Sequence, residues 1–255
     1  MSDDSFFPTI QTQGQGQPVM VLHGGGGPFT VAGLAQGLAA RHQVFTPTHP
    51  GWNGTPRPAG LSTISQLAAL YLGWLTAQDL RGVVLVGSSV GGWLAAELAL
   101  QDRGERVAGL VLLDAVGIDV PGEPIRDFFG LDARGVADYS FHDAARFYVD
   151  PATLTPEQRA GRAANMQALR AYAGDPYMHD PGLRARLPEL TQPTLVLWGE
   201  SDRIVTPEYG AAFAAALLEA RFEVIAQAGH LPQIEQPEAT LTRIEAFSGE
   251  VRRSP

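Results

Sequence analysis

The chain has 255 residues, an apolar fraction of 45% and a net charge of −9, which predicts one acidic globular domain without a basic surface for nucleic acid. It contains no Cys, and all 18 basic residues are Arg, so disulfides, zinc–thiolate sites, Walker-type phosphate loops and Schiff-base lysines are excluded. No run approaches the roughly 18 apolar residues of a membrane span. The acidic start lacks the basic region of a secretory signal, so we expect a cytoplasmic protein that does not bind membranes.

Short apolar runs alternate along the chain with Ala- and Leu-rich stretches. Runs of this length are typical of strands buried on both faces of a parallel sheet. We expect one strand around Phe6–Gln11 and six more at Val19–Leu22, Val44–Thr46, Val83–Val86, Leu110–Leu113, Thr194–Trp198 and Arg221–Ile225. We expect helices near 30–41, 62–78, 91–102, 207–219 and 236–248. This alternation predicts an α/β fold with a doubly wound, mostly parallel sheet.

The region from 118 to 188 interrupts the alternation because it contains no convincing strand. We expect short helices there, at about 125–131, 142–149, 156–173 and 181–187. An insertion of about 70 residues is far longer than an ordinary connection. We therefore expect a helical cap or lid over 118–188, inserted into a core formed by 1–117 and 189–255. Ordinary crossover helices that pack on one face of the sheet are the alternative.

Gly87–Gly91 reads Gly-Ser-Ser-Val-Gly and lies between the apolar run Val83–Val86 and a helix-like stretch. The pattern G-x-S-x-G in this context predicts a sharp, strained strand-to-helix turn that exposes the hydroxyl of its central residue, Ser89. An ordinary Gly/Ser-rich turn is the alternative. Because serine is a poor nucleophile at its free pKa, a catalytic Ser89 needs a neighbouring base.

His230 is the strongest candidate for that base. It follows the predicted strand 221–225, at the sheet edge where open α/β sheets bind ligands. Asp202 follows the strand 194–198 and is the expected carboxylate partner of the imidazole, which gives the chain order Ser, Asp, His. Asp114, at another strand end, is an alternative acid, and Glu200 is expected to be a solvated neighbour.

A glycine run, His23-Gly24-Gly25-Gly26-Gly27, follows the strand 19–22. Backbone N–H groups in such a loop can face a reacting carbonyl without interference from side chains. We expect the N–H of Gly25, with Gly26 as the next choice, to form an oxyanion hole with the N–H of Val90. His23 is expected to hold the loop by hydrogen bonds. A phosphate loop is disfavoured because no Lys follows, and no His, Asp and Glu cluster has metal-ligand spacing.

Together these motifs resemble the α/β-hydrolase fold superfamily. The matching pieces span about 19–248, and they are His23-Gly24-Gly25, Pro50-Gly51-Trp52-Asn53-Gly54-Thr55, Gly87-Ser88-Ser89-Val90-Gly91-Gly92, Gly199-x-x-Asp202 and Gly229-His230. The resemblance implies a serine hydrolase without cofactor or metal, with a helical cap over its pocket. Ser rather than Asp at position 89 disfavours the epoxide hydrolases and haloalkane dehalogenases of this superfamily.

The resemblance leaves the substrate open. We expect a serine hydrolase, similar to carboxylesterases, that cleaves a carboxylic ester or a related acyl bond of a small, largely apolar substrate through an acyl-enzyme on Ser89. A carbon–carbon hydrolase of the meta-cleavage type, a non-catalytic ligand-binding protein and an acyltransferase are the alternatives. The glycine run resembles that of carbon–carbon hydrolases and proline iminopeptidases, but Pro28 comes later here, after four glycines. The oligomeric state is not predicted.

Overall fold

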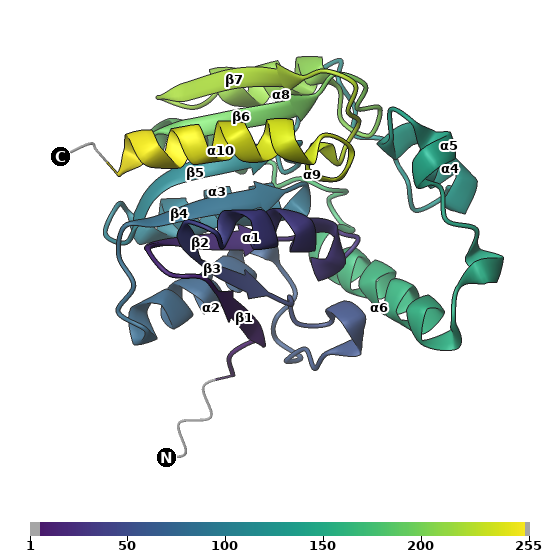
Figure 1. The fold of residues 1–255 in the computed structure, drawn as a ribbon, viewed down its shortest axis with the longest axis horizontal. Helices are drawn as coiled ribbons and strands as arrows, with labels where there is room; N and C mark the ends of the chain where they lie inside the picture. Colours follow the sequence, from purple (N-terminus) through teal and green to yellow (C-terminus); the bar gives the residue numbers. More distant parts are fainter. Residues whose placement is uncertain (1–5, 253–255) are drawn as a thin grey trace.

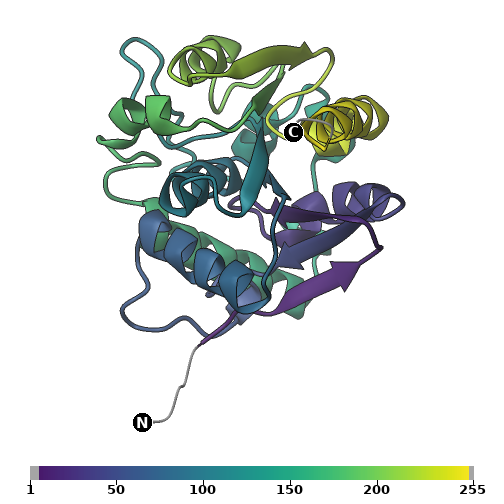
Figure 2. The same ribbon diagram turned by 90° about the vertical axis from the view of Figure 1, so that its left-hand side faces the viewer.

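The fold is taken from a computed structural model that describes residues 6–252. Its centre is a seven-stranded sheet with the strand order β1-β3-β2-β4-β5-β6-β7. All neighbouring strands pair in parallel except β1, which pairs antiparallel with β3. Helices cover both faces of the sheet (Figure 1, Figure 2). The prediction of a doubly wound, mostly parallel α/β fold is therefore confirmed.

Each of the six apolar runs predicted after residue 18 forms a strand, and these strands are β2 (Gln17–Leu22), β3 (His42–Pro47), β4 (Val83–Ser88), β5 (Val107–Leu113), β6 (Thr194–Gly199) and β7 (Ala220–Ile225). The strand before them is β1 (Ile10–Gln13). The first strand was expected around Phe6–Gln11 and lies later in the chain. Ile10 pairs with Pro47, the last residue of β3, so residues 6–9 lie beyond the end of their partner strand.

Helices pack on the two faces through alternate side chains of the strands. Met20 and Leu85 face a cluster formed with α2 (Ile64–Ala77), α3 (Val90–Asp102) and α8 (Pro207–Ala215). Their neighbours Val21 and Val86 face the opposite cluster, formed with α1 (Ala32–Leu38) and α10 (Pro237–Val251). This alternation is why the central strands read as continuous apolar runs. Among residues 6–252, no helix combines the length and apolarity needed to cross a membrane.

The segment between β5 and β6 contains four α-helices. They are α4 (Ala133–Ser140), α5 (Ala144–Phe147), α6 (Pro156–Ala173) and α7 (Leu183–Arg186). Figure 1 shows α4, α5 and α6 at one end of the sheet, on the right of the view. The longest of them, α6, has the bounds that the sequence predicts. Its first turn is fixed by Pro156 and by a capping box between Thr155 and Gln158.

The helix expected at 125–131 is absent, and this prediction is wrong. The N–H of Arg126 donates to the carbonyl of Ile204, and the N–H of Phe128 donates to the hydroxyl of Tyr177. The carbonyl of Arg126, which a helix over 125–131 would pair with the N–H of Gly130, instead accepts from the hydroxyl of Tyr177 at 2.7 Å, so a tertiary contact replaces a helical hydrogen bond. The helix forms later, as α4, where Asp132 accepts a hydrogen bond from the N–H of Gly135 and caps the first turn.

Several other helices are shorter than expected. The stretch 142–149 contains only α5, and 181–187 contains α7 followed by a 3₁₀ turn, η4 (Leu187–Glu189). The helix expected over 207–219 ends at Ala215. Near the N-terminus, a 3₁₀ turn, η1 (Pro28–Val31), precedes α1. A four-residue helix, α9 (Pro232–Glu235), precedes α10.

Candidate active site

Ser89 lies at the turn that joins β4 to α3. Its backbone has φ 56° and ψ −120°, a strained conformation for a residue with a side chain. The turn also requires glycine on both sides. A Cβ atom at Gly87 would collide with the carbonyl oxygen of Gly91, and one at Gly91 would collide with the carbonyl oxygen of Leu22. The sequence pattern thus forms the strained turn that it predicts, with Ser89 lining a cavity.

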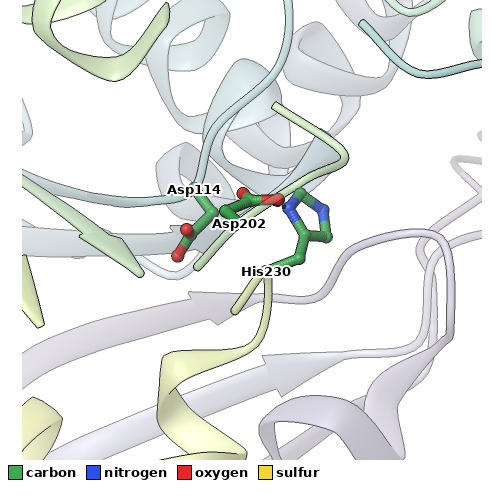
Figure 3. Close-up of side chains that lie close together, drawn as sticks. All are labelled: Asp114, Asp202 and His230. Carbon is green, nitrogen blue, oxygen red and sulfur yellow. Dashed lines mark hydrogen bonds and ion pairs between the residues drawn. The ribbon is translucent and has the colours of Figure 1, made fainter. Parts of the chain in front are cut away.

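The structure brings Ser89, His230 and Asp202 together. Nε2 of His230 lies 3.0 Å from Oγ of Ser89, and Nδ1 lies 2.7 Å from Oδ2 of Asp202. Figure 3 shows the ring of His230 next to the carboxylate of Asp202. Because the carboxylate only accepts, Nδ1 carries the proton and Nε2 is free to accept the proton of the serine hydroxyl. This is the geometry of a nucleophile with an oriented general base.

The backbone holds the carboxylate of Asp202 in place. Its Oδ1 accepts hydrogen bonds from the N–H groups of Ile204 at 2.8 Å and Val205 at 3.2 Å. Its side chain is fully buried, and that of His230 is 10% exposed. Hydrogen bonds to the charged form of a carboxylate favour that form. Asp202 can therefore stabilise a positive charge on the imidazole.

The other two candidate acids do not hydrogen-bond to His230. Glu200 is exposed and accepts from the N–H of Gln227 at 3.1 Å, as expected for a solvated neighbour. Asp114 is buried beside Asp202, and its Oδ1 accepts from the N–H of Gly199 at 2.8 Å. Asp114, Asp202 and His230 have potential ligand atoms within 4.8 Å of one another. Nδ1 of His230 already bonds to Asp202 in this group, so a metal ion would have to displace that bond.

The glycine loop is held by two buried histidines, as predicted for His23. Nδ1 of His23 donates to the carbonyl of Gly24 at 2.8 Å, and its Nε2 accepts from the N–H of His49 at 3.1 Å. Nε2 of His49 donates to the carbonyl of His23, and its Nδ1 accepts from the hydroxyl of Tyr71. Burial lowers the pKa of His23 to about 4 and the pKa of His49 well below its usual value. Both rings are therefore neutral, with fixed tautomers.

Two further side chains bind carbonyl groups of the same loop. Nε1 of Trp52 donates to the carbonyl of Gly25 at 3.0 Å, and Nδ2 of Asn165, from α6, donates to the carbonyl of Gly26 at 2.8 Å. Gly25 and Val90 line the cavity that contains Ser89. Val90 is the first residue of α3, so its N–H has no acceptor within the helix. The role of these two N–H groups in an oxyanion hole stays a prediction.

A cavity of about 410 Å³ opens over Ser89 and His230. This volume lies within the range of small-molecule sites, roughly 300–1,000 Å³. Its walls are mainly apolar and come from the glycine loop (residues 23–27), from α9, and from residues 118–188 between β5 and β6, which we call the inserted segment. The inserted segment contributes Ile125, Phe128, Leu131, Val136, Phe141, Phe147, Val149, Arg162, Asn165, Met166 and Leu169, among others. Among residues 6–252, Arg162 is the one arginine that lines this cavity.

Glu235, in α9, was not predicted from the sequence to have a role in the site. This buried carboxylate accepts hydrogen bonds from three backbone N–H groups: Gly229 at 2.6 Å, His142 at 3.1 Å and Asp143 at 3.1 Å. The N–H of His230 also donates to the carbonyl of Ser140 at 2.7 Å. The loop that carries His230 is therefore attached to the turn between α4 and α5. A glutamate between two prolines gives no sequence signal of such a role.

The fold and the geometry of the site together are those of a serine hydrolase. Residues 19–243 match the model of the alpha/beta hydrolase family, and the chain belongs to this family. It is 30% identical to a 2-hydroxy-6-oxononadienedioate/2-hydroxy-6-oxononatrienedioate hydrolase of Paraburkholderia xenovorans (strain LB400), over 88% of this chain and 84% of the relative. It is 29% identical to a 2-hydroxymuconate semialdehyde hydrolase of Pseudomonas putida, over 94% and 90% of the two chains.

A solved structure adds a second kind of relative. The thermophilic esterase of Thermogutta terrifontis superimposes with a TM-score of 0.74 at 26% identity, over 95% of this chain and 93% of that chain. The similar proteins therefore include hydrolases of 2-hydroxy-6-oxo acids and of a semialdehyde, as well as an esterase. The family relationship confirms that the chain is a hydrolase of the α/β fold.

Proposed function

We propose that the protein hydrolyses a carbon–carbon bond next to a ketone, in a small conjugated substrate that carries a carboxylate. The relatives by sequence support this alternative over the ester hydrolase that the sequence analysis placed first. Their names describe 2-hydroxy-6-oxo acids and a semialdehyde, in which a carbonyl carbon is joined to an unsaturated, conjugated chain. The C1 carboxylate and the C6 carbonyl lie at opposite ends of that conjugated chain, and the dioates carry a second carboxylate beyond the carbonyl.

Arg162 is the observation that carries the proposal. It is an exposed residue of α6 that lines a largely apolar cavity, and no carboxylate within residues 6–252 forms an ion pair with it. A guanidinium group binds a carboxylate with paired hydrogen bonds, whereas an apolar ester offers it no partner. A substrate with its carbonyl at Ser89 and its carboxylate at Arg162 would leave the conjugated chain against the apolar wall.

In the proposed first step, Oγ of Ser89 attacks the carbonyl carbon while Nε2 of His230 takes the hydroxyl proton. Asp202 stabilises the imidazolium that forms. The N–H groups of Gly25 and Val90 bind the negative charge that develops on the carbonyl oxygen. Loss of one such donor costs about 10²- to 10³-fold in kcat.

In the second step, the bond between the former carbonyl carbon and the conjugated chain breaks. Cleavage proceeds from the 2-oxo tautomer, in which the hydroxyl proton of the substrate has moved to the departing carbon and made it saturated. The electron pair left on this carbon is delocalised through the remaining double bond onto the oxygen at C2, and His230 returns its proton to the resulting dienolate. An acyl group remains on Ser89. A water molecule, deprotonated by His230, then attacks the acyl-enzyme, and collapse of the new intermediate releases a carboxylic acid and restores the serine hydroxyl.

We propose that 118–188 acts as the cap of this site, inserted into the core formed by 1–117 and 189–255. Asn165 supports this role because it bonds to both sides of the glycine-loop region: it donates to the carbonyl of Gly26 and accepts from the N–H of Asn53 at 2.7 Å. Leu169, one turn later in α6, would lie 2.6 Å from a Cβ atom at Gly25. Close contacts of this kind exclude water from the reacting carbonyl.

Ester hydrolysis is the second candidate function. It is favoured by the similarity to the esterase of Thermogutta terrifontis and requires the same serine, histidine and aspartate. An ester with an apolar acyl group would use the cavity without any contact to Arg162. The two functions therefore differ in their dependence on this one side chain.

The test compares two substrates in three forms of the enzyme. A 2-hydroxy-6-oxo-dienoate and a p-nitrophenyl ester of similar size are assayed with the wild-type enzyme, Arg162→Gln and Arg159→Gln. Arg159, one turn earlier in α6, donates to the carbonyl of Leu154 and is the matched control. We expect Arg162→Gln to raise KM for the dienoate by about 10- to 100-fold, which is the value of a hydrogen bond to a charged group. Ester hydrolysis should be unchanged. Preference for the ester in kcat/KM, with no effect of Arg162→Gln, would refute the carbon–carbon assignment.

A further inference from the structure

Asp114 is a buried carboxyl group for which the proposed reaction has no use. It follows β5 directly, its side chain is inaccessible to solvent, and its Oδ1 accepts one backbone hydrogen bond, from Gly199. Its Oδ2 is buried and has no donor among residues 6–252. A buried ionised carboxylate with one oxygen unsatisfied is costly, so this oxygen requires an explanation.

The neighbours of Asp114 explain why its second oxygen has no donor. The charged groups whose field reaches it are Asp202, in the loop after β6, and Glu235, in α9, and both carry the same sign as an ionised Asp114. A carboxyl oxygen of Asp114 lies within 4.8 Å of an oxygen of Asp202 and of a ring nitrogen of His230. Figure 3 places Asp202 between the other two side chains in that view.

Two carboxyl groups in one buried site do not both ionise. Asp202 accepts two backbone N–H groups and the N–H of His230, all of which favour its charged form. Asp114 has one such donor. Burial, followed by the charge of Asp202, raises the pKa of Asp114 well above its usual range. The proton of the pair therefore resides on Asp114.

We propose that Asp114 is a neutral positioning residue that donates its carboxyl O–H to Asp202, so that the pair presents one negative charge to His230. The inference rests on the proposed role of Asp202. The bond would satisfy the otherwise unpaired oxygen of Asp114. It would also add a further hydrogen-bond donor to the carboxylate of Asp202, which orients the imidazole.

The direct test is infrared spectroscopy at pH 8, where ordinary carboxyl groups are ionised. We expect wild-type protein to show the carbonyl stretch of a protonated carboxylic acid, and Asp114→Asn to lack it. Asp102→Asn is the control, because Asp102 is also buried but accepts from Arg106 and Val107, outside the site. Absence of the band in wild-type protein, or its survival in Asp114→Asn, would overturn the proposal. This readout requires no turnover, so it is independent of the proposed reaction.

The pH profile of kcat/KM gives a second, kinetic test. Asp114→Asn keeps a hydrogen-bond donor and carries no charge, so its acid limb should coincide with that of the wild-type enzyme. If Asp114 were charged, its neutralisation would move that limb to lower pH by at least about one unit. Asp114→Leu keeps the approximate shape but loses the donor, and its kcat should fall about 10-fold with little change in KM. A shifted limb in Asp114→Asn, or equal kcat values for folded Asn and Leu variants, would refute the role.

Discussion

Glu235 accepts a hydrogen bond at 2.6 Å from the N–H of Gly229, the residue directly before His230. The same carboxylate accepts from His142 and Asp143, in the turn between α4 and α5. One buried side chain thus connects the loop that carries the proposed base to the inserted segment. The position of the imidazole of His230 therefore depends on how the inserted segment packs against the rest of the protein.

Glu235→Gln should weaken this connection. The side-chain amide of Gln has one oxygen that accepts, whereas the carboxylate has two. At least one of the three backbone N–H groups would therefore face the NH₂ group of the amide, which is itself a donor. We expect the free energy of unfolding to fall by about 1–3 kcal/mol, since a buried donor is left unsatisfied. We also expect kcat to fall about 10-fold, because a displaced imidazole loses general-base catalysis worth 10²- to 10⁴-fold. Urea denaturation and steady-state kinetics measure the two effects.

Glu238→Gln is the matched control, because Glu238 is exposed at the start of α10. It should change neither quantity. If Glu235→Gln lowered stability but left kcat at the wild-type value, the carboxylate would serve the fold alone, and the connection to His230 would be refuted.

The buried histidines predict a loss of stability in mild acid. Burial lowers the pKa of His23 from 6.5 to about 4, so between these values the unfolded chain binds a proton that the folded chain does not. The free energy of unfolding should therefore fall as the pH falls through this window, by about 2 kcal/mol between pH 7 and pH 5 from His23 alone. Denaturation of wild-type protein and His23→Gln at both pH values measures the difference. An equal pH dependence in the two proteins would show that His23 does not contribute.

Gly24→Ala should reduce activity through direct contact with the nucleophile. A Cβ atom at this position would lie 2.9 Å from the carbonyl oxygen of Ser88 and 2.9 Å from Cβ of Ser89. We expect the turn that carries Ser89 to shift and kcat to fall about 10²-fold, as for a 1 Å misplacement of reacting groups. Gly33→Ala is the control. Its Cβ meets no atom within 4 Å, and it lies in the helix α1, where Ala is favoured over Gly by about 1 kcal/mol. Equal activity of both variants would show that the loop tolerates a side chain.

The central sheet and the three proposed catalytic residues could be predicted from the sequence because local physics determines them. Short apolar runs such as Val83–Val86 are typical of strands that are buried on both faces of a parallel sheet. Gly87 and Gly91 are required by a turn that admits no Cβ atom. Parallel strands then bring the loops that carry Ser89, Asp202 and His230 to the same edge, so their contact follows from topology.

The inserted segment was less predictable because tertiary contacts decide its structure. The carbonyl of Arg126 bonds to the distant hydroxyl of Tyr177 and not to an N–H one turn later, so the helix that the apolar neighbours suggest does not form. The role of Glu235 and the neutral state that we infer for Asp114 could not be predicted for the same reason. Each depends on groups more than 80 residues away in the chain, such as His142 for Glu235 and Gly199 for Asp114.

The most direct test of the account is covalent labelling of Ser89 together with turnover. Intact-protein mass spectrometry after treatment with a fluorophosphonate should show one adduct per chain, located on Ser89, in the wild-type enzyme. Ser89→Ala should show no adduct and should lose about 10⁶-fold in kcat, as when a catalytic serine is removed from a serine hydrolase. His230→Ala should label far more slowly. Turnover of any substrate by Ser89→Ala at the wild-type rate, or an adduct on another residue, would contradict the claim that Ser89 is the nucleophile.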